Sequence, residues 1–136
     1  MQLNDDLIEL LNLAYELCED GNYSKALPIY DKILKKDPKN IQALIDKAVT
    51  LQTLGKLDKS LKLLDSALQI EPKNIIALVN MGSVLHSLEE YEKAISCYDK
   101  ALKFDKKCAM ALAYKGLSLG EQGKIPQDRK STRLNS

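Results

Sequence analysis

The sequence is poor in the residues that most often carry chemistry. Among 136 residues it has one histidine, three cysteines, one phenylalanine and no tryptophan. The cysteines are odd in number and none are spaced C-x-x-C, so neither a disulfide framework nor a zinc site is expected. No apolar run approaches the roughly 20 residues of a membrane span, and the N-terminus lacks the basic and apolar parts of a secretion signal. We therefore expect a cytoplasmic protein without a membrane partner.

An excess of charge of one sign is also missing. The 20 basic and 19 acidic residues leave a formal net charge of +1, and the lysines form no long run. Nucleic acid is therefore not expected as a partner. His86 has only Glu89 and Glu90 at helical contact spacing, which favours a surface contact over catalysis. There is no glycine-rich phosphate loop. The sequence predicts no catalytic residue, no metal site and no cofactor.

What the sequence does have is an internal repeat of 34 residues. The segment 37–41 aligns with 71–75 without gaps, and this fixes the frame. One column of that frame admits only small residues, and these are Ala14, Ala48, Gly82 and Gly116. A fixed period of this size indicates stacked units, none of which can bury its apolar face alone. Such an array predicts a binding surface rather than a reaction centre.

Each repeat contains two segments of helical periodicity. In the second repeat apolar residues recur at i, i+3, i+4 and i+7 over 41–51 and again over 57–70. Gly55 can take the left-handed conformation that ends the first helix, Pro72 stops the second, and Asn74 can cap the next. The fold class is therefore all-α, with two helices in each repeat.

Two residues depart from this pattern. Glu89 occupies the place of Gly21 and Gly55, so the third turn must carry strain or take another geometry. Pro28 lies inside the second helix of the first repeat. With Ser24 as the N-cap, Pro28 would be the fourth helical residue and would forfeit one terminal hydrogen bond. We expect a helix there nonetheless.

The columns resemble those of the tetratricopeptide repeat (TPR) family. That family favours a small residue at the eighth place, alanine at the twentieth, an aromatic at the twenty-fourth and proline at the thirty-second. The matching residues beyond the small column are Ala26, Ala94, Tyr30, Tyr98, Pro38 and Pro72. Ser60, Leu64 and Lys106 depart from the pattern. The resemblance implies an α-solenoid in which antiparallel helix pairs form a right-handed superhelix.

The resemblance also divides the chain. The TPR array spans residues 1–125, with repeats 7–40, 41–74 and 75–108 and a partial repeat 109–125. The remaining residues, 126–136, form a non-repeat tail that contains both arginines of the chain. We expect this tail to be either a disordered polar end or foreign residues joined to a truncated array, and we favour the second explanation.

In this family the second, fifth, sixth and ninth places of each repeat line the concave side of the superhelix. Carried over, the predicted groove residues are Ile8, Leu11, Asn12, Tyr15, Gln42, Ile45, Asp46, Val49, Ile76, Val79, Asn80, Ser83, Met110, Ala113, Tyr114 and Leu117. The second, fifth and sixth places include no Lys or Arg, so an acidic chaperone tail is a poor fit for this groove.

The sixth places carry the polar groups of this groove. Asn12 and Asn80 can bond to the main chain of an extended peptide, and Asp46 favours a nearby Lys, Arg or amine. An alternative is that Leu11, Ile45 and Val79 pack against the neighbouring repeat while the asparagines are merely solvated. The sequence does not decide between binding and packing.

Three hypotheses about function follow. The leading one is a non-enzymatic scaffold for protein–protein interaction that binds a peptide segment in the groove. The second is the TPR targeting region of a larger, truncated enzyme such as a transferase. The third is self-association through the uncapped C-terminal end, where Tyr98, Ala101 and Leu102 are expected to be poorly covered.

Overall fold

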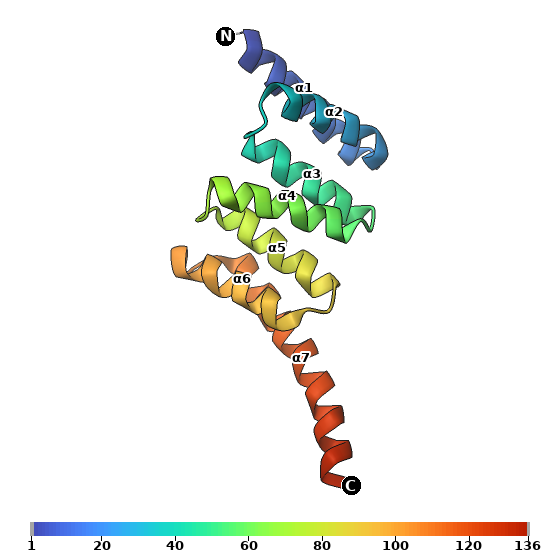
Figure 1. Ribbon diagram of the computed structural model, residues 1–136, viewed down its shortest axis with the longest axis vertical. Helices are drawn as coiled ribbons and strands as arrows, with labels where there is room; N and C mark the ends of the chain where they lie inside the picture. Colours follow the sequence, from blue (N-terminus) through green and yellow to red (C-terminus); the bar gives the residue numbers. More distant parts are fainter. Residues whose placement is uncertain (1, 136) are drawn as a thin grey trace. The chain divides into compact units, whose positions relative to one another are not determined.

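The computed structural model describes the backbone of residues 2–135 and the side chains of residues 5–123. These residues form seven helices and no strand, so the predicted all-α fold class is confirmed (Figure 1). The helices are α1 (Gln2–Glu19), α2 (Tyr23–Lys36), α3 (Ile41–Thr53), α4 (Leu57–Ile70), α5 (Ile75–Ser87), α6 (Tyr91–Phe104) and α7 (Ala109–Asn135). The chain divides into two compact units, unit 1 (Met1–Pro72) and unit 2 (Lys73–Ser136).

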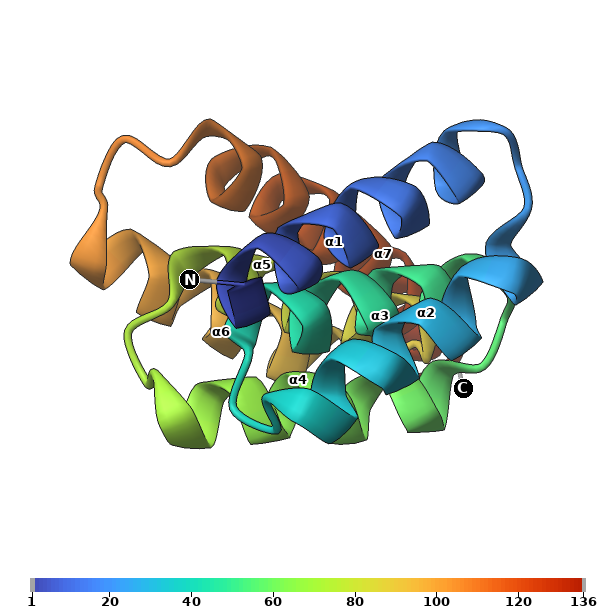
Figure 2. The same ribbon diagram turned by 90° about the horizontal axis from the view of Figure 1, so that it is seen from above.

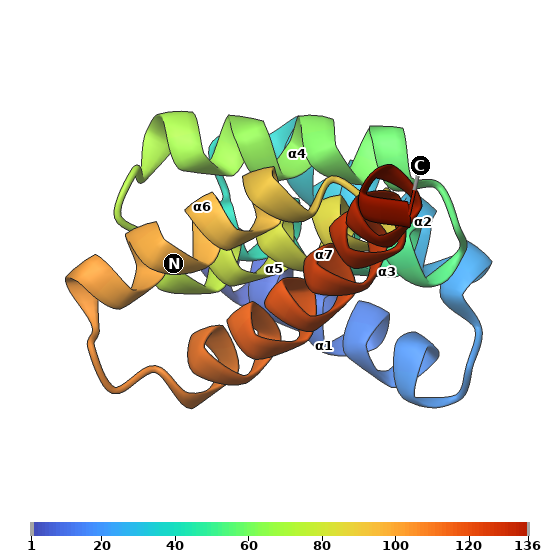
Figure 3. The ribbon, with the colours of Figure 1, turned by 90° about the horizontal axis from the view of Figure 1, so that it is seen from below.

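Three antiparallel helix pairs, α1–α2, α3–α4 and α5–α6, occupy the three full predicted repeats, and the partial repeat falls in the single helix α7. In unit 1, α1 pairs with α2 and α3 with α4, and α2 also packs against α3 (Figure 2). In unit 2, α5 pairs with α6, and α7 packs against both α6 and α5 (Figure 3). The helices α1, α3 and α5 begin these pairs, and α7 holds the same place in the partial repeat. These four, called the first helices below, carry the predicted groove residues.

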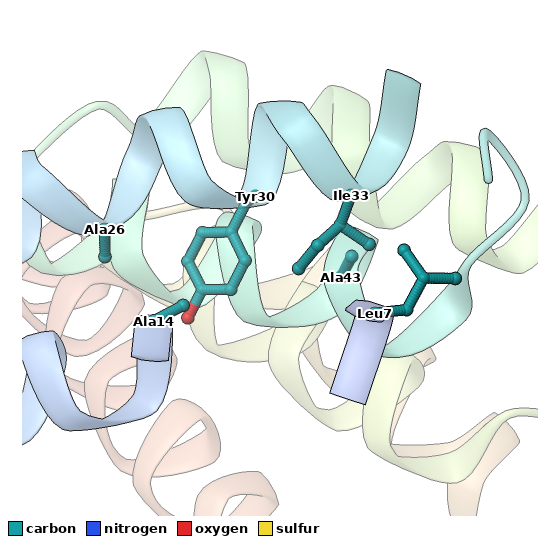
Figure 4. Packing of buried hydrophobic residues seen from close by; sticks show 6 residues of the cluster. All are labelled: Leu7, Ala14, Ala26, Tyr30, Ile33 and Ala43. Atoms are coloured by element: carbon teal, nitrogen blue, oxygen red, sulfur yellow. The ribbon is translucent and has the colours of Figure 1, made fainter. Parts of the chain in front are cut away.

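The core of unit 1 shows why the repeat needs small residues. Ala14 of α1 and Ala26 of α2 are fully buried where the two helices meet, and Tyr30 and Ile33 fill the space beside them (Figure 4). Helices whose axes are about 8–10 Å apart leave no room for long side chains at the point of closest approach. The small columns predicted from the sequence are therefore packing positions.

The equivalent contact in unit 2 is tighter. Gly82 lies against the ring of Tyr98, and a Cβ added at Gly82 would stand 2.7 Å from Cζ and 2.9 Å from Cδ1 of that ring. Gly116 occupies the same column in α7, and a Cβ there would meet no atom within 4 Å. Gly82 is thus required by its neighbour, whereas Gly116 is not.

The second repeat accommodates its two departures from the family pattern. Ser60 replaces the usual alanine, and its hydroxyl donates to the carbonyl oxygen of Ala48 at 2.7 Å. Leu64 replaces the aromatic residue and is fully buried. A buried hydroxyl is tolerated when it has a hydrogen-bond partner, so neither change interrupts the helix pair.

The cap predicted at Asn74 is confirmed, and Asn40 forms the same cap one repeat earlier. The side-chain oxygen of Asn40 accepts from the N–H of Ala43 at 2.9 Å, and that of Asn74 accepts from Ala77 at the same distance. Each cap provides a partner for an N–H that the first turn of a helix leaves without one.

The third turn keeps the geometry of the other turns despite its glutamate. Glu89 has a φ of 63°, close to the 78° of Gly55. The closing hydrogen bond is also the same, since Glu90 N donates to Leu85 O at 2.9 Å and Lys56 N to Leu51 O at 2.8 Å. Of the two expected outcomes, strain in the shared geometry is the one observed.

Pro28 lies within α2, as expected, but the predicted cap is wrong. The N-cap is Asn22 rather than Ser24, so Pro28 is the sixth residue of the helix. The cause is the preceding turn, in which Asn22 N donates to Leu17 O at 2.7 Å and fixes where the new helix begins.

Helix α7 covers the end of α6. Tyr98 is 1% exposed and Ala101 is fully buried, so the expectation that these residues are poorly covered is wrong. The boundary predicted after residue 125 falls within α7. The predicted tail, 126–136, lies beyond the described side chains, and its disorder or foreign origin stays a prediction.

Candidate functional site

The predicted groove residues differ in exposure according to their place in the repeat. The second and ninth places hold exposed side chains, apart from the partly buried Ser83. The large apolar members of this set are Ile8, Tyr15, Val49, Ile76, Met110 and Leu117, which are 37–64% exposed. Each unit therefore presents accessible apolar side chains on these helices, unit 1 on α1 and α3 and unit 2 on α5 and α7.

The fifth places behave differently. Ile45 is 5% exposed and Val79 is 3% exposed, so these two residues belong to the core. Leu11 is half-buried and Ala113 is exposed. For Ile45 and Val79 the structure supports the packing alternative rather than direct contact with a ligand.

Two of the four sixth places, Asp46 and Asn80, form hydrogen bonds within their own helices. Gln42 Nε2 donates to both carboxylate oxygens of Asp46, at 2.9 and 3.0 Å. Burial raises the pKa of Asp46, and the hydrogen bond from Gln42 opposes that shift. Asn80 Nδ2 donates to Ile76 O at 2.9 Å, so one donor of this amide is used inside α5. Asn12 is exposed and Tyr114 is half-buried.

A polar cluster joins the two helix pairs of unit 1. The hydroxyl of Tyr30 lies 3.7 Å from Cys18 Sγ, which lies 3.5 Å from Thr50 Oγ1. Thr50 Oγ1 also donates to Asp46 O at 2.8 Å. Burial raises the pKa of Tyr30, and the hydrogen bond with Thr50 opposes the shift. Tyr30 is therefore neutral and must hydrogen bond to be buried at low cost.

Unit 2 has the corresponding cluster with different chemistry. His86 Nδ1 lies 2.8 Å from Ser118 Oγ, and Ser118 also hydrogen bonds to Tyr98. Burial raises the pKa of Tyr98 to about 12, although the bond to Ser118 lowers it. The His86 ring also meets Tyr91 edge-to-face, with centroids 5.1 Å apart. His86 thus packs against these residues rather than only pairing with neighbouring glutamates.

A pocket of about 150 Å³ opens beside this cluster. Its lining comes from three helices and consists of Ser83, His86, Ser87, Tyr98, Tyr114 and Leu117. Ser83, Tyr114 and Leu117 are predicted groove residues, and the sequence did not single out Ser87. The signal that was available is the alignment of His86 and Ser118 with Cys18 and Thr50 in the repeat frame.

A second depression of about 440 Å³ lies in unit 1, away from the predicted groove places. It is lined by Asp6, Glu9, Leu10, Leu13, Lys32 and Lys36, from α1 and α2. Acidic side chains come from α1 and basic ones from α2, so the depression has no net excess of one sign.

Comparison with known families decides what this array is. A family model described as "Psidin, N-terminal TPR repeats region" matches residues 11–123. This chain belongs to the tetratricopeptide repeat family. The TPR helix pairs described above are therefore those of the family that the repeat columns resemble.

Solved TPR structures share this fold. The first TPR of Spaghetti (RPAP3), bound to an HSP90 peptide, has a TM-score of 0.82 at 18% identity, over 88% of this chain and 94% of that chain. The Sgt2 TPR domain of Aspergillus fumigatus has a TM-score of 0.81 at 19% identity, over 91% and 82%. An O-GlcNAc transferase of Thermobaculum terrenum has a TM-score of 0.81 at 21% identity, over 88% of this chain but 23% of that chain. No curated protein matches the TPR chain.

The described part of the TPR chain offers little for catalysis. Ser118 is close to an imidazole, but its side chain is fully buried, so a substrate cannot reach its hydroxyl. Burial raises the pKa of Cys97 despite the opposing charge of Lys100, which keeps this thiol protonated. Among the described residues no cluster of three metal-binding side chains occurs, and no helix is both long and apolar enough to cross a bilayer.

Proposed function

We propose that this chain is a non-enzymatic scaffold that binds an extended segment of another protein along its first helices. One observation carries the proposal. Among the side chains that the structure describes, residues 5–123, six of the eleven exposed large apolar ones fall at the second and ninth places of the repeats. Exposed apolar side chains that gather on one set of helices mark an interaction surface more often than scattered ones do.

The charges on this face favour an apolar segment that is neutral or basic. Asp46 is the single charged residue among the predicted groove places, and its carboxylate is already bonded by Gln42. An acidic segment would lose hydration and meet no cation there. The TPR of Spaghetti binds an HSP90 peptide, whereas the groove proposed here lacks the lysines and arginines suited to an acidic tail.

The expected affinity is that of a short apolar contact. A micromolar dissociation constant corresponds to a binding free energy of about −8 kcal/mol. A displayed library of random peptides, selected on the purified chain, supplies a peptide ligand for the measurement. Fluorescence anisotropy of the enriched peptide then measures its affinity for each variant.

The matched variants differ only in which helices they alter. Ile76→Glu combined with Leu117→Glu changes two exposed residues on first helices, at 62% and 60% exposure. We expect a loss of about tenfold or more in affinity. The control combines Ile70→Glu with Phe104→Glu, which changes two exposed residues on second helices, and it should bind as the wild type does. Equal affinity for both double variants would contradict the proposed surface.

A targeting region of a larger enzyme remains the alternative. The likeness to the O-GlcNAc transferase covers 23% of that chain and shows the fold alone. Intact-mass measurement of the protein from its native source distinguishes the two, because an attached enzyme adds mass beyond 15.2 kDa. Cytoplasmic location stays a prediction that imaging of the tagged protein can test.

Self-association is a second proposal with a specific observation behind it. Leu112 and Leu119 of α7 are 53% and 47% exposed, although Leu44 and Leu51 at the same places of the second repeat are buried. A second copy that covers these leucines would restore the burial seen elsewhere. Light scattering across concentration tests this, and a constant monomer mass would dismiss it.

A further inference from the structure

The pocket of unit 2 has a shape and chemistry that the proposed groove does not explain by itself. We propose that it takes one aromatic side chain of the bound segment and prefers tyrosine to phenylalanine. This inference rests on the proposed peptide-binding function and names what one residue of that peptide must be.

The volume and the lining fit a single ring. A cavity of about 150 Å³ accommodates a benzene-sized group. The half-buried Tyr114 supplies an aromatic wall, and the buried ring of Tyr98 packs against it, with ring centroids 6.0 Å apart and planes inclined by 51°. Leu117, which is 60% exposed, adds an apolar surface to the pocket. Aromatic rings pack favourably against such tilted partners.

The hydrogen-bond chain behind the pocket sets the tautomer of His86. The buried phenol of Tyr98 is neutral, so it needs an acceptor for its proton, and Ser118 is its hydrogen-bond partner. A Ser118 hydroxyl that accepts from Tyr98 is free to donate its own proton to His86 Nδ1, 2.8 Å away. The ring proton of neutral His86 then resides on Nε2.

The other edge of the imidazole therefore offers a donor. His86 lines the pocket and its Nδ1 is bonded to Ser118, so Nε2 is the ring nitrogen that the proposal assigns to the ligand. Ser87 Oγ donates to Ser83 O at 3.2 Å and retains lone pairs that can accept. A tyrosine hydroxyl can accept from His86 and donate to Ser87.

Other side chains fit less well. No lysine, arginine, aspartate or glutamate lines the pocket, so a carboxylate would be buried without a counter-charge. Phenylalanine and leucine would cover the polar edge of His86 without a partner for its N–H, which is unfavourable. The chemistry thus selects a neutral ring with a hydroxyl group.

The test uses N-acetyl-tyrosine amide, N-acetyl-phenylalanine amide and N-acetyl-leucine amide as probes of the full chain. The chain contains one histidine, so the imidazole signals of a nitrogen-labelled sample belong to His86 alone. Their ¹⁵N shifts report the tautomer directly. Titration by NMR should show the Nε2–H form and a dissociation constant of about millimolar for the tyrosine probe.

The preference is expected to be about 3- to 10-fold for tyrosine over phenylalanine, the range of one neutral hydrogen bond. Leucine should bind more weakly than either. His86→Phe keeps a ring but removes the N–H, and Ser87→Ala changes an exposed residue without threatening the fold. Each variant removes one of the two proposed hydrogen bonds and should lower the preference for tyrosine, and the double variant should bring the two aromatic probes to equal affinity.

Equal binding of tyrosine and phenylalanine to the wild type, or an Nδ1–H tautomer, would overturn the inference. The result separates it from the proposed function. Peptides enriched by display without an aromatic residue would leave the scaffold proposal standing and remove this one. A bound tyrosine probe without any enriched peptide would confirm the selectivity of the pocket and overturn the peptide-binding function on which its occupant depends.

Discussion

Within unit 1 and within unit 2, one repeat is joined to the next by the same two kinds of contact, an ion pair and a tyrosine cluster, at the same places of the repeat. Lys47 Nζ lies 2.6 Å from Asp31 Oδ1, and Lys115 Nζ lies 2.7 Å from Asp99 Oδ1. Each pair joins the seventh place of one repeat to the twenty-fifth place of the repeat before it. The tyrosine clusters are also in equivalent positions, because both link the tenth, twelfth and twenty-fourth places. An exposed ion pair adds little stability, so its recurrence matters more for register than for energy.

Between the second and third repeats, the same places of the repeat hold other residues. Leu64 stands at the tyrosine place of the second repeat, Met81 at the lysine place of the third, and Val84 at its tenth place. Asp65 accepts from Gln69 within α4 at 2.9 Å instead of from a lysine. The pattern of polar partners therefore recurs every two repeats, although the packing pattern recurs every one. A buried tyrosine requires hydroxyl or imidazole partners, and a buried leucine does not.

The two units differ in how closely the tyrosine approaches the first helix. In unit 1 Tyr30 packs beside Ala14, whereas in unit 2 Tyr98 lies against Gly82. The partners differ as well, since Cys18 is a weak hydrogen-bonding group and His86 is a strong one. The closer approach in unit 2 accompanies the pocket lined by Tyr98. The absence of one methyl group at Gly82 and the imidazole of His86 thus both distinguish the unit 2 contact from that of unit 1.

The largest expected effect comes from adding that methyl group. Gly82→Ala places a Cβ against the Tyr98 ring, and we expect a loss of about 1–3 kcal/mol in the free energy of unfolding. Urea denaturation followed by circular dichroism measures it. Gly116→Ala is the matched control in the same column, where the Cβ meets nothing, and it should stabilise the helix by about 0.5–1 kcal/mol.

A double variant tests whether the ring is the cause. Gly82→Ala combined with Tyr98→Leu reproduces the Ala48 and Leu64 pair of the second repeat. Its cost should be smaller than the sum of the two single changes, because the ring that clashes is gone. Additive costs would show that Gly82 is needed for another reason.

The hydroxyl groups provide the next comparison. Tyr98→Phe removes the partner of Ser118, and Tyr30→Phe removes a contact with Cys18 and Thr50. We expect a cost of about 0.5–1.5 kcal/mol for Tyr98→Phe. The cost for Tyr30→Phe should be smaller because a thiol is the weaker partner and Thr50 keeps its bond to Asp46 O. Equal costs from thermal unfolding would contradict the distinction between the two clusters.

The sequence was sufficient for the helix pairs because their determinants repeat. The small column, the asparagine caps and the turn glycines recur every 34 residues, and each has a local physical reason that can be recognised without coordinates. The start of α2 was misplaced at Ser24 because the preceding turn, rather than the side chain of the cap, decides where that helix begins.

The candidate site was only partly predictable. The second and ninth places lie mostly on the accessible face, but Ile45 and Val79 are buried by packing that a single repeat cannot reveal. The pocket depends on contacts between His86, Ser118 and Tyr98, which lie in three different helices. Such contacts leave a trace in the sequence only when alternate repeats are compared.

The smallest effect concerns the turns, where unit 1 has glycine and unit 2 has Glu89. A left-handed conformation costs a non-glycine residue about 1–2 kcal/mol, and Glu89 has a φ of 63°. Glu89→Gly should relieve this strain but lose part of the gain to the greater freedom of glycine in the unfolded chain. We expect a net stabilisation of about 0.5–1 kcal/mol by urea denaturation. Gly55→Ala, at a φ of 78°, is the matched reverse change and should destabilise the chain. Failure of Glu89→Gly to stabilise, with Gly55→Ala costly, would mean that the side chain of Glu89 offsets its own strain.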